Sequence, residues 1–208
     1  MKTSTHSKGR TPLKKRRVWF LLEGIVALAT AFWLLEFREA QSNTRAERNV
    51  STVSMGAQMP YAVQRRAKIT IAVIVEGPLA SAMQKALRAE VHNAKIGDVE
   101  VVPELERAYP NPVLVVRLGK QSLLWTPLFA ASSVGIRAGF VSSGETGLLM
   151  ETPVTVDNKN GPVLILSGEY RFTDCSWGLI SRLGYHRFLA EYAARQIVAS
   201  LQDLYAGP

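Results

Sequence analysis

The chain has 208 residues and a formal net charge of +8. Seven of its 25 basic residues lie in residues 1–17, which hold no acidic residue, so the rest of the chain carries 18 basic against 17 acidic side chains. A nucleic-acid-binding domain needs a basic face that displaces counterions from phosphates. The near-neutral balance beyond residue 17 therefore excludes nucleic acid as the expected partner.

The most informative segment is an apolar run, Val18–Leu35, that follows a basic cluster. As a helix, a run of this length extends roughly 27 Å, about the thickness of a bilayer core. We therefore expect residues 1–17 to be a basic cytoplasmic tail and residues 18–37 to be a transmembrane helix. By the positive-inside rule, the side chains that set this orientation are those of Lys14, Lys15, Arg16 and Arg17.

This interpretation makes the protein a single-pass protein of the cell (inner) membrane with a periplasmic C-terminal domain. The alternative is a cleaved signal peptide, because Ala29 and Ala31 have the small-residue spacing of a cleavage site. The apolar run continues beyond these alanines, which favours an uncleaved signal-anchor.

Beyond the span, composition predicts a polar juxtamembrane linker over residues 38–67 and a folded domain over residues 68–208. Each element of the domain is predicted from its apolar spacing, which alternates in strands and has a period near 3.6 in helices. In chain order we expect a strand at 69–75, a helix from 78 that ends before 97, strands at 99–103, 112–118 and 134–142, a hairpin made by 148–156 and 162–172, and a helix at 187–205.

This order of elements predicts the fold class α+β: a single N-terminal transmembrane helix, then a small extracytoplasmic domain with a mostly antiparallel sheet and two helices on one face. The layout looks like several small bacterial envelope-assembly domains, in the order of its elements alone. Cys175 is the single cysteine, so no internal disulfide can form and the hydrophobic core must hold the domain together.

An acidic residue and a stripe of small residues interrupt the apolar run. Glu23 would be costly in lipid unless it is protonated or has a polar neighbour. Gly24, Ala27, Thr30 and Ala31 lie at spacings that let a second helix approach closely. We interpret these five residues as a helix-packing site. Glu23 alone has two further interpretations, a side chain without a role and the proton carrier of a membrane motor subunit, since ion-driven motor subunits are similar in tail, span and outer domain.

An aromatic cluster lies where the last strand meets the last helix, and it includes Phe172, Trp177 and Tyr185. Packing in the core is the default interpretation for such a cluster. The alternative is a partner-binding surface made by these three side chains.

The sequence offers no catalytic constellation. Its three histidines have no metal-ligand spacing, and it contains no nucleophile elbow, phosphate-binding loop or dinucleotide fingerprint. A thiol–imidazole pair of Cys175 with His186 has no local support. We therefore expect no enzyme activity, no cofactor and no metal.

The leading functional hypothesis is a non-catalytic accessory or structural subunit of a membrane protein complex. Its expected partners are membrane protein subunits, contacted through the span and the outer domain, and the lipid bilayer. The alternative is an envelope binding, transport or assembly factor that holds a lipid, a glycan or a peptide.

Overall fold

The computed structural model describes residues 13–55, 69–76, 79–104, 106–149 and 163–206. Within these ranges the chain forms six strands, three α-helices and a short 3-10 helix. In chain order they are α1 (Leu13–Leu34), β1 (Arg38–Met55), β2 (Ile69–Glu76), α2 (Ala80–Asn93), β3 (Gly97–Val101), β4 (Val113–Thr126), β5 (Phe129–Val141), η2 (Thr146–Leu149), β6 (Val163–Ile180) and α3 (Arg182–Ala206).

The six strands form one mixed sheet in the order β1-β6-β5-β4-β2-β3. β1, β6, β5 and β4 pair antiparallel, whereas β2 runs parallel to both of its neighbours, β3 and β4. In the described residues the sheet is therefore mixed: three of its five strand pairs are antiparallel, and the two parallel pairs at β2 were not predicted. The parallel part follows from the crossover through α2, because parallel neighbours need a connection of this kind. Residues 71–75 of β2 are all buried, which is typical of a parallel strand covered on both faces.

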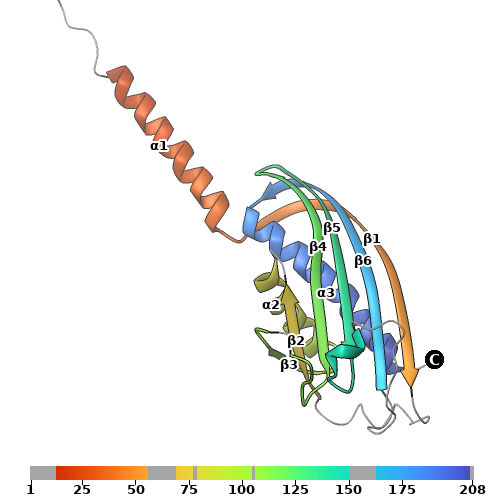
Figure 1. The fold of residues 1–208 in the computed structure, drawn as a ribbon. Helices are drawn as coiled ribbons and strands as arrows, with labels where there is room; N and C mark the ends of the chain where they lie inside the picture. The colour runs from red at the N-terminus through yellow and green to blue at the C-terminus, as the bar shows by residue number, and fades with distance from the viewer. Residues whose placement is uncertain (1–12, 56–68, 77–78, 105, 150–162, 207–208) are drawn as a thin grey trace, which may run out of the picture.

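Helices α2 and α3 pack on one face of this sheet and on each other (Figure 1). They enclose the main hydrophobic core, whose largest members include Met83 and Leu87 from α2, Ile197 and Leu201 from α3, and Leu114, Phe140 and Leu166 from the strands. A smaller cluster on the opposite face contains Val113, Val115 and Ile165, with Leu149 of η2 packed against it.

Residues 38–55, which the sequence suggested to be linker, form the edge strand β1. It pairs with β6 without interruption from Arg38 opposite Ile180 to Met55 opposite Val163. Its polar composition is compatible with an edge position, because, of its described side chains, Ala40 and Val50 alone are hydrophobics packed against the main core. The remainder of the proposed linker, residues 56–68, lies outside the described residues.

Strands β4 and β5 are longer than the sequence predicted, and they form a hairpin whose turn lies between Thr126 and Phe129. The register of β4 shifts between Leu118 and Gln121, which is the signature of a bulge and bends the strand. Figure 1 shows the curved strands, with the hairpin close to the C-terminal end of α1. Of the separate hairpin predicted around residues 157–161, the second strand is part of β6, which pairs with β1 and β5. Residues 150–162, which contain its turn and most of its first strand, lie outside the described residues.

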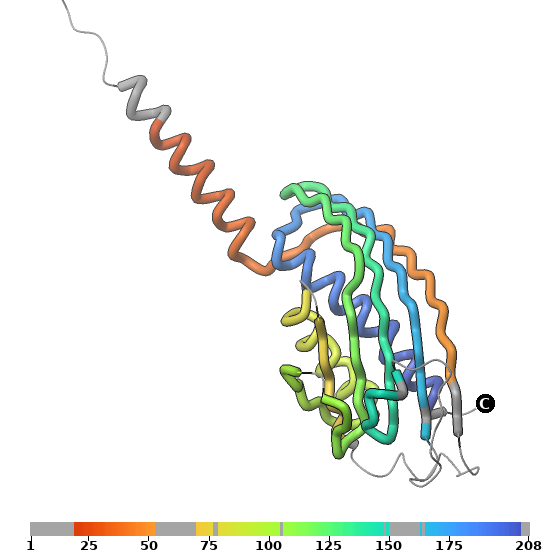
Figure 2. The backbone as a smooth tube through the Cα atoms, viewed as in Figure 1, coloured from red at the N-terminus to blue at the C-terminus, as the bar shows by residue number. Residues whose placement is uncertain are grey.

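Helix α1 projects away from the sheet and the other helices (Figure 2). Among the residues whose structure is described, no helix combines the length and the apolar character needed to cross a membrane. The first turns of α1 hold Lys14–Arg17 and the helix ends at Leu34. Its apolar part is therefore shorter than the roughly 20 residues that a bilayer core requires, and it contains Glu23. The prediction of a single-pass transmembrane helix acting as a signal-anchor is wrong.

Candidate interaction surface at the base of helix α1

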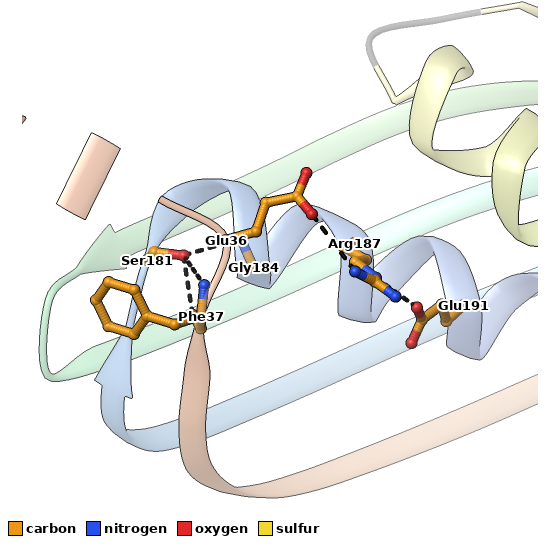
Figure 3. A network of polar contacts seen from close by, with 6 residues as sticks. All are labelled: Glu36, Phe37, Ser181, Gly184, Arg187 and Glu191. Atoms are coloured by element: carbon orange, nitrogen blue, oxygen red, sulfur yellow. Dashed lines mark hydrogen bonds and ion pairs between the residues drawn. The ribbon is translucent and has the colours of Figure 1, made fainter. Parts of the chain in front are cut away.

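The connection between α1 and β1 is hydrogen-bonded to the start of α3 through Ser181 (Figure 3). The Ser181 hydroxyl is the N-cap of α3, because it accepts the N–H of Gly184 at 3.0 Å. The same oxygen accepts the N–H of Phe37 at 2.9 Å and donates to the Phe37 carbonyl at 2.8 Å. The Ser181 N–H also donates to that carbonyl, at 3.0 Å. One buried serine therefore caps a helix and holds a segment that lies far away in the sequence.

Gly184 makes this close approach possible. A Cβ atom at this position would lie 2.3 Å from the Phe37 carbonyl oxygen and 2.8 Å from the Ser181 hydroxyl oxygen. Contacts this short with the backbone do not occur in real structures, so a side chain here would displace the connection. The α1–β1 connection can rest on α3 because this residue has no side chain.

Ion pairs on the surface support the same connection. Arg187 lies 3.4 Å from Glu36 and 2.7 Å from Glu191, one turn further along α3 (Figure 3). The hydrogen bond to Glu191 raises the pKa of Arg187 above its ordinary value. These side chains are exposed and screened by solvent, so the pairs contribute little to stability. Their main effect is to hold the α1–β1 connection, through Glu36, against the surface of α3.

Aromatic side chains attach the last turn of α1 to the domain. The rings of Trp33 and Trp125 meet edge-to-face at a centroid distance of 6.1 Å, and the guanidinium of Arg182 lies 4.1 Å from the centre of the Trp33 ring. The Trp125 indole N–H donates to the Ile180 carbonyl at 3.1 Å. Phe32 packs edge-to-face on Phe37 at 5.0 Å. With Ser181, these contacts make a joint that fixes α1 relative to the sheet.

Beyond this joint, α1 exposes apolar side chains in every direction. Trp19, Phe20, Leu21 and Leu22 are consecutive and each is at least 51% exposed. Successive helical residues lie about 100° apart, so these four side chains surround the helix axis. An ordinary surface helix buries one apolar stripe, whereas a helix that is apolar all round is surrounded by an apolar environment. The described residues of the domain leave this apolar surface of α1 uncovered.

A second apolar surface lies at the end of the sheet from which α1 leaves. We call it the apolar rim, and it consists of the exposed side chains Leu123, Leu124, Leu128, Trp177, Leu179 and Leu183. The Trp177 ring packs on Phe129 at a centroid distance of 4.4 Å. In the part of the chain that the structure describes, every exposed large hydrophobic side chain belongs to α1, to Leu35 next to it, or to the apolar rim. Exposed apolar surface is thus concentrated at one end of the molecule.

The predicted helix-packing site lies on the exposed part of α1. A Cβ atom on Gly24 would meet nothing within 4 Å, and Glu23 and Ala27 are exposed. The Thr30 hydroxyl donates to the Val26 carbonyl at 2.8 Å, within the helix itself. Ala31 is partly buried. The stripe is therefore open to a partner. The structure describes the helical backbone of Lys14–Arg17 but not the side chains of these basic residues.

The three residues proposed as an aromatic partner surface lie in different environments. Phe172 and Tyr185 are 2% and 0% exposed and belong to the main core, whereas Trp177 is 64% exposed. The difference follows from strand alternation, because Phe172 points to the helix-covered face of β6 and Trp177 to the opposite face. Only Trp177 is available to a partner. Sequence reasoning missed Leu124 and Leu128 beside it, because the hairpin that exposes them was not predicted.

A buried polar cluster lies beneath the joint, and no local sequence pattern predicts it. Asp174 is buried and accepts hydrogen bonds from Thr44 at 2.7 Å, Ser176 at 2.7 Å and Tyr185 at 2.8 Å. Arg38 donates to Ser176 at 3.2 Å, and its guanidinium lies 3.6 Å from the centre of the Phe188 ring. Burial raises the pKa of Tyr185 and lowers that of Arg38. The cluster links β1, β6 and α3, and we assign it a structural role.

The thiol–imidazole pair does not form. Cys175 is exposed on the face of β6 opposite to the helices, whereas His186 lies on α3. In the described ranges of the chain, no three His, Cys, Asp or Glu side chains are grouped so that they could hold a metal ion.

A groove of about 700 Å³ runs between α2 and α3. Ala82, Ala86 and Leu183 contribute apolar lining, whereas charged side chains come from both helices and from the α1–β1 connection. The charged members are Glu36, Lys85, Glu90, Arg187 and Glu191. His186 also lines the groove, and burial, with a smaller contribution from Arg182, lowers its pKa.

Comparison with known proteins identifies no family. No family model matches the sequence, and no curated protein matches it. Among solved structures, the PelC dodecamer from Paraburkholderia phytofirmans is 13% identical with a TM-score of 0.35, over 73% of this chain and 96% of that chain. A variant of that dodecamer gives 16% identity and a TM-score of 0.37, over 74% and 98%. A minor lipoprotein from Acinetobacter baumannii gives 10% and 0.25, over 64% and 95%. Likenesses with such low TM-scores carry no argument about this chain.

Proposed function

We propose that this protein is a non-catalytic accessory subunit of a membrane-associated complex and that α1 is the element that binds the partner. The observation that carries the proposal is the combination of an apolar surface on all sides of α1 with the joint that fixes the helix to the domain. A flexible tether would need no such joint. A helix held in one direction presents its side chains at a set position, which suits docking between helices of another subunit.

The small residues of α1 support this assignment. Ala27 and Gly24 lie on the exposed part of the helix and permit a second helix to approach its backbone closely. Within this proposal, Glu23 supplies a hydrogen-bonding group to the partner. The location at a membrane is part of the proposal and rests on the apolar character of α1. The membrane orientation predicted from Lys14–Arg17 depended on a transmembrane helix, so the proposal includes no orientation.

Co-purification tests the proposal. The full chain carries an affinity tag at its C-terminus and is isolated in mild detergent, and associated proteins are identified by mass spectrometry. Replacing both Ala27 and Ala31 by Leu fills the small-residue stripe, so we expect the amount of associated partner to fall at least several-fold. Leu28→Met on the same helix conserves volume and is the matched control. Equal recovery of the partner with all three proteins would show that α1 does not bind it.

The groove between α2 and α3 favours a second candidate function, an assembly or transport factor that holds a ligand. Its charged lining suits a peptide better than a lipid, since lipid-binding cavities are predominantly apolar. Ala89→Trp would fill part of the groove without altering α1. If this candidate is correct, native mass spectrometry of the purified wild-type chain should reveal a bound peptide that the variant lacks.

A further inference from the structure

We infer that the apolar rim binds the surface of a lipid bilayer. This inference rests on the proposed location at a membrane and names the surface that the domain contacts there. Trp177, Leu124 and Leu128 are 64%, 58% and 63% exposed, and they lie around the base of α1 rather than along it. Exposed apolar surface that is gathered at one end of a molecule marks an interaction site.

The charges around the rim favour lipid over a neutral apolar protein surface. The chain has no charged residue between Lys120 and Arg137, a stretch that includes the whole β4–β5 turn, and none between Asp174 and Arg182. Asp174 is buried, whereas Lys120 is exposed and Arg182 is partly exposed at the margin of the rim. An uncharged centre with Lys120 and Arg182 at its margin is complementary to acyl chains bordered by anionic headgroups.

Acidic residues lie at the edges of this surface rather than within it. Glu39 on β1 stands opposite Leu179 in the sheet and marks the border on that side. Glu36 in the α1–β1 connection is paired with Arg187 at 3.4 Å. The rim itself therefore offers anionic lipid an apolar surface without an unpaired carboxylate at its centre.

Tryptophans are concentrated at the end of the molecule that carries the apolar rim. Three of the four tryptophans in the chain, Trp33, Trp125 and Trp177, lie at this end of the molecule. The indole ring has an apolar body and a polar N–H, so it favours the boundary between headgroups and acyl chains. Trp33 and Trp177 are 51% and 64% exposed and available to lipid, whereas Trp125 is half-buried and its N–H donates to the Ile180 carbonyl.

A fluorescent label tests whether the rim enters lipid. In a full-length background carrying Cys175→Ser, an environment-sensitive dye is attached to cysteine in Leu128→Cys or, as the control, in Ser51→Cys. Ser51 is exposed near the other end of β1, roughly 40 Å along the strand from Arg38. Vesicles contain phosphatidylcholine with about a quarter phosphatidylglycerol. We expect dye at position 128 to shift to the blue, brighten several-fold and be quenched by brominated lipid, with no change at position 51.

Charge insertion provides the second measurement. The double variant Leu124→Glu and Leu128→Glu places carboxylates in the rim, so we expect the blue shift of a dye at native Cys175 to be lost, while Ser51→Glu leaves it intact. Equal thermal melting of both variants excludes unfolding. A dye at position 128 that stays in water while the protein floats with vesicles would overturn the inference, as would a response to a purified partner protein but not to vesicles.

The two proposals fail separately. If Ala27→Leu with Ala31→Leu leaves co-purification unchanged while the dye at position 128 still enters lipid, the role of α1 is refuted and the rim inference stands. If co-purification depends on the alanines and the dye stays in water, the reverse holds.

Discussion

At the scale of single residues, Asp174 shows how the chain stabilises a polar group in its core. A buried carboxylate is tolerated when several donors satisfy it, and here hydroxyl groups from β1, β6 and α3 do so. Because these donors come from three elements, the residue couples the edge strand β1 to the rest of the fold. Removing the carboxylate would take away the acceptor of all three hydroxyls, although Tyr185 keeps its contact with Ser132 at 3.0 Å and Ser176 keeps that with Arg38 at 3.2 Å.

We therefore expect Asp174→Ala to lower the free energy of unfolding by about 2–4 kcal/mol, because it leaves buried donors unsatisfied. Urea denaturation followed by circular dichroism measures this change. The matched control is Asp203→Ala, whose carboxylate is exposed and lies 3.9 Å from Arg48. That substitution should change stability by less than about 0.5 kcal/mol. Similar losses for the two variants would argue against a structural role for the buried cluster.

His186 makes the stability of the domain depend on pH. Its Nε2 atom is buried without a hydrogen-bond partner in the described residues, and burial lowers the pKa of the imidazole below the ordinary value of 6.5. Between the lowered pKa and about 6.5, the unfolded chain binds more protons than the folded chain. The contribution of His186 to stability is therefore present above pH 6.5 and is lost as the pH falls toward the lowered pKa.

We expect the urea midpoint of the wild type to decrease between about pH 7.5 and pH 5 by more than that of His186→Gln, which cannot titrate in this range. Parallel denaturation curves at the two pH values measure the difference. A variant that keeps the full pH dependence would assign it to other groups.

At the scale of elements, the start of α3 performs two tasks at once. Ser181 caps the helix, and its hydrogen bonds to Phe37 attach the α1–β1 connection. Gly184 provides the space for this contact. The position of α1 is thus determined by residues that lie more than a hundred positions away in the sequence. This joint holds α1 in the fixed direction on which its proposed docking role depends.

Gly184→Ala tests the joint. The new methyl group would meet the Phe37 carbonyl oxygen, so we expect the connection to detach and the amide hydrogens of Phe37 and Ser181 to exchange at least ten times faster. Hydrogen exchange followed by mass spectrometry measures this. Gly147→Ala is the control, because a Cβ atom at that position meets nothing within 4 Å. Unchanged protection in Gly184→Ala would mean that the connection adapts without loss.

At the scale of the whole molecule, apolar exposure is strongly asymmetric. α1 and the apolar rim lie at one end, while the exposed side chains of β1 are mainly polar. Apolar area removed from water contributes roughly 25 cal/mol per Å², so covering this end of the molecule with an apolar surface is favourable.

We expect the purified full chain to form large assemblies in detergent-free buffer and a small, uniform species in mild detergent. Light scattering after size-exclusion chromatography measures the mass, and a monomer without detergent would contradict the expectation.

The sequence by itself determined the features that depend on local spacing. The β-branched run of β2, the amphipathic pattern of α3 and the helical character of the apolar run at α1 are all visible in neighbouring letters. Strand β2 also contained a clue to its parallel neighbours in its continuous burial. The position of Trp177 on a different face from Phe172 follows from alternation along one strand.

Only the tertiary structure decided the features that depend on distant partners. Hydropathy locates an apolar run but not where the helix begins and ends, so the predicted span over residues 18–37 differs from the helix that runs from Leu13 to Leu34. β1 has too few apolar residues to be predicted as a strand from its own sequence. It is held in the sheet by its backbone pairing with β6. The joint at Ser181 and the rim around Leu128 arise where segments far apart in the sequence meet. Local physics specifies the elements, whereas the contacts between elements are long-range and determine which side chains the molecule exposes.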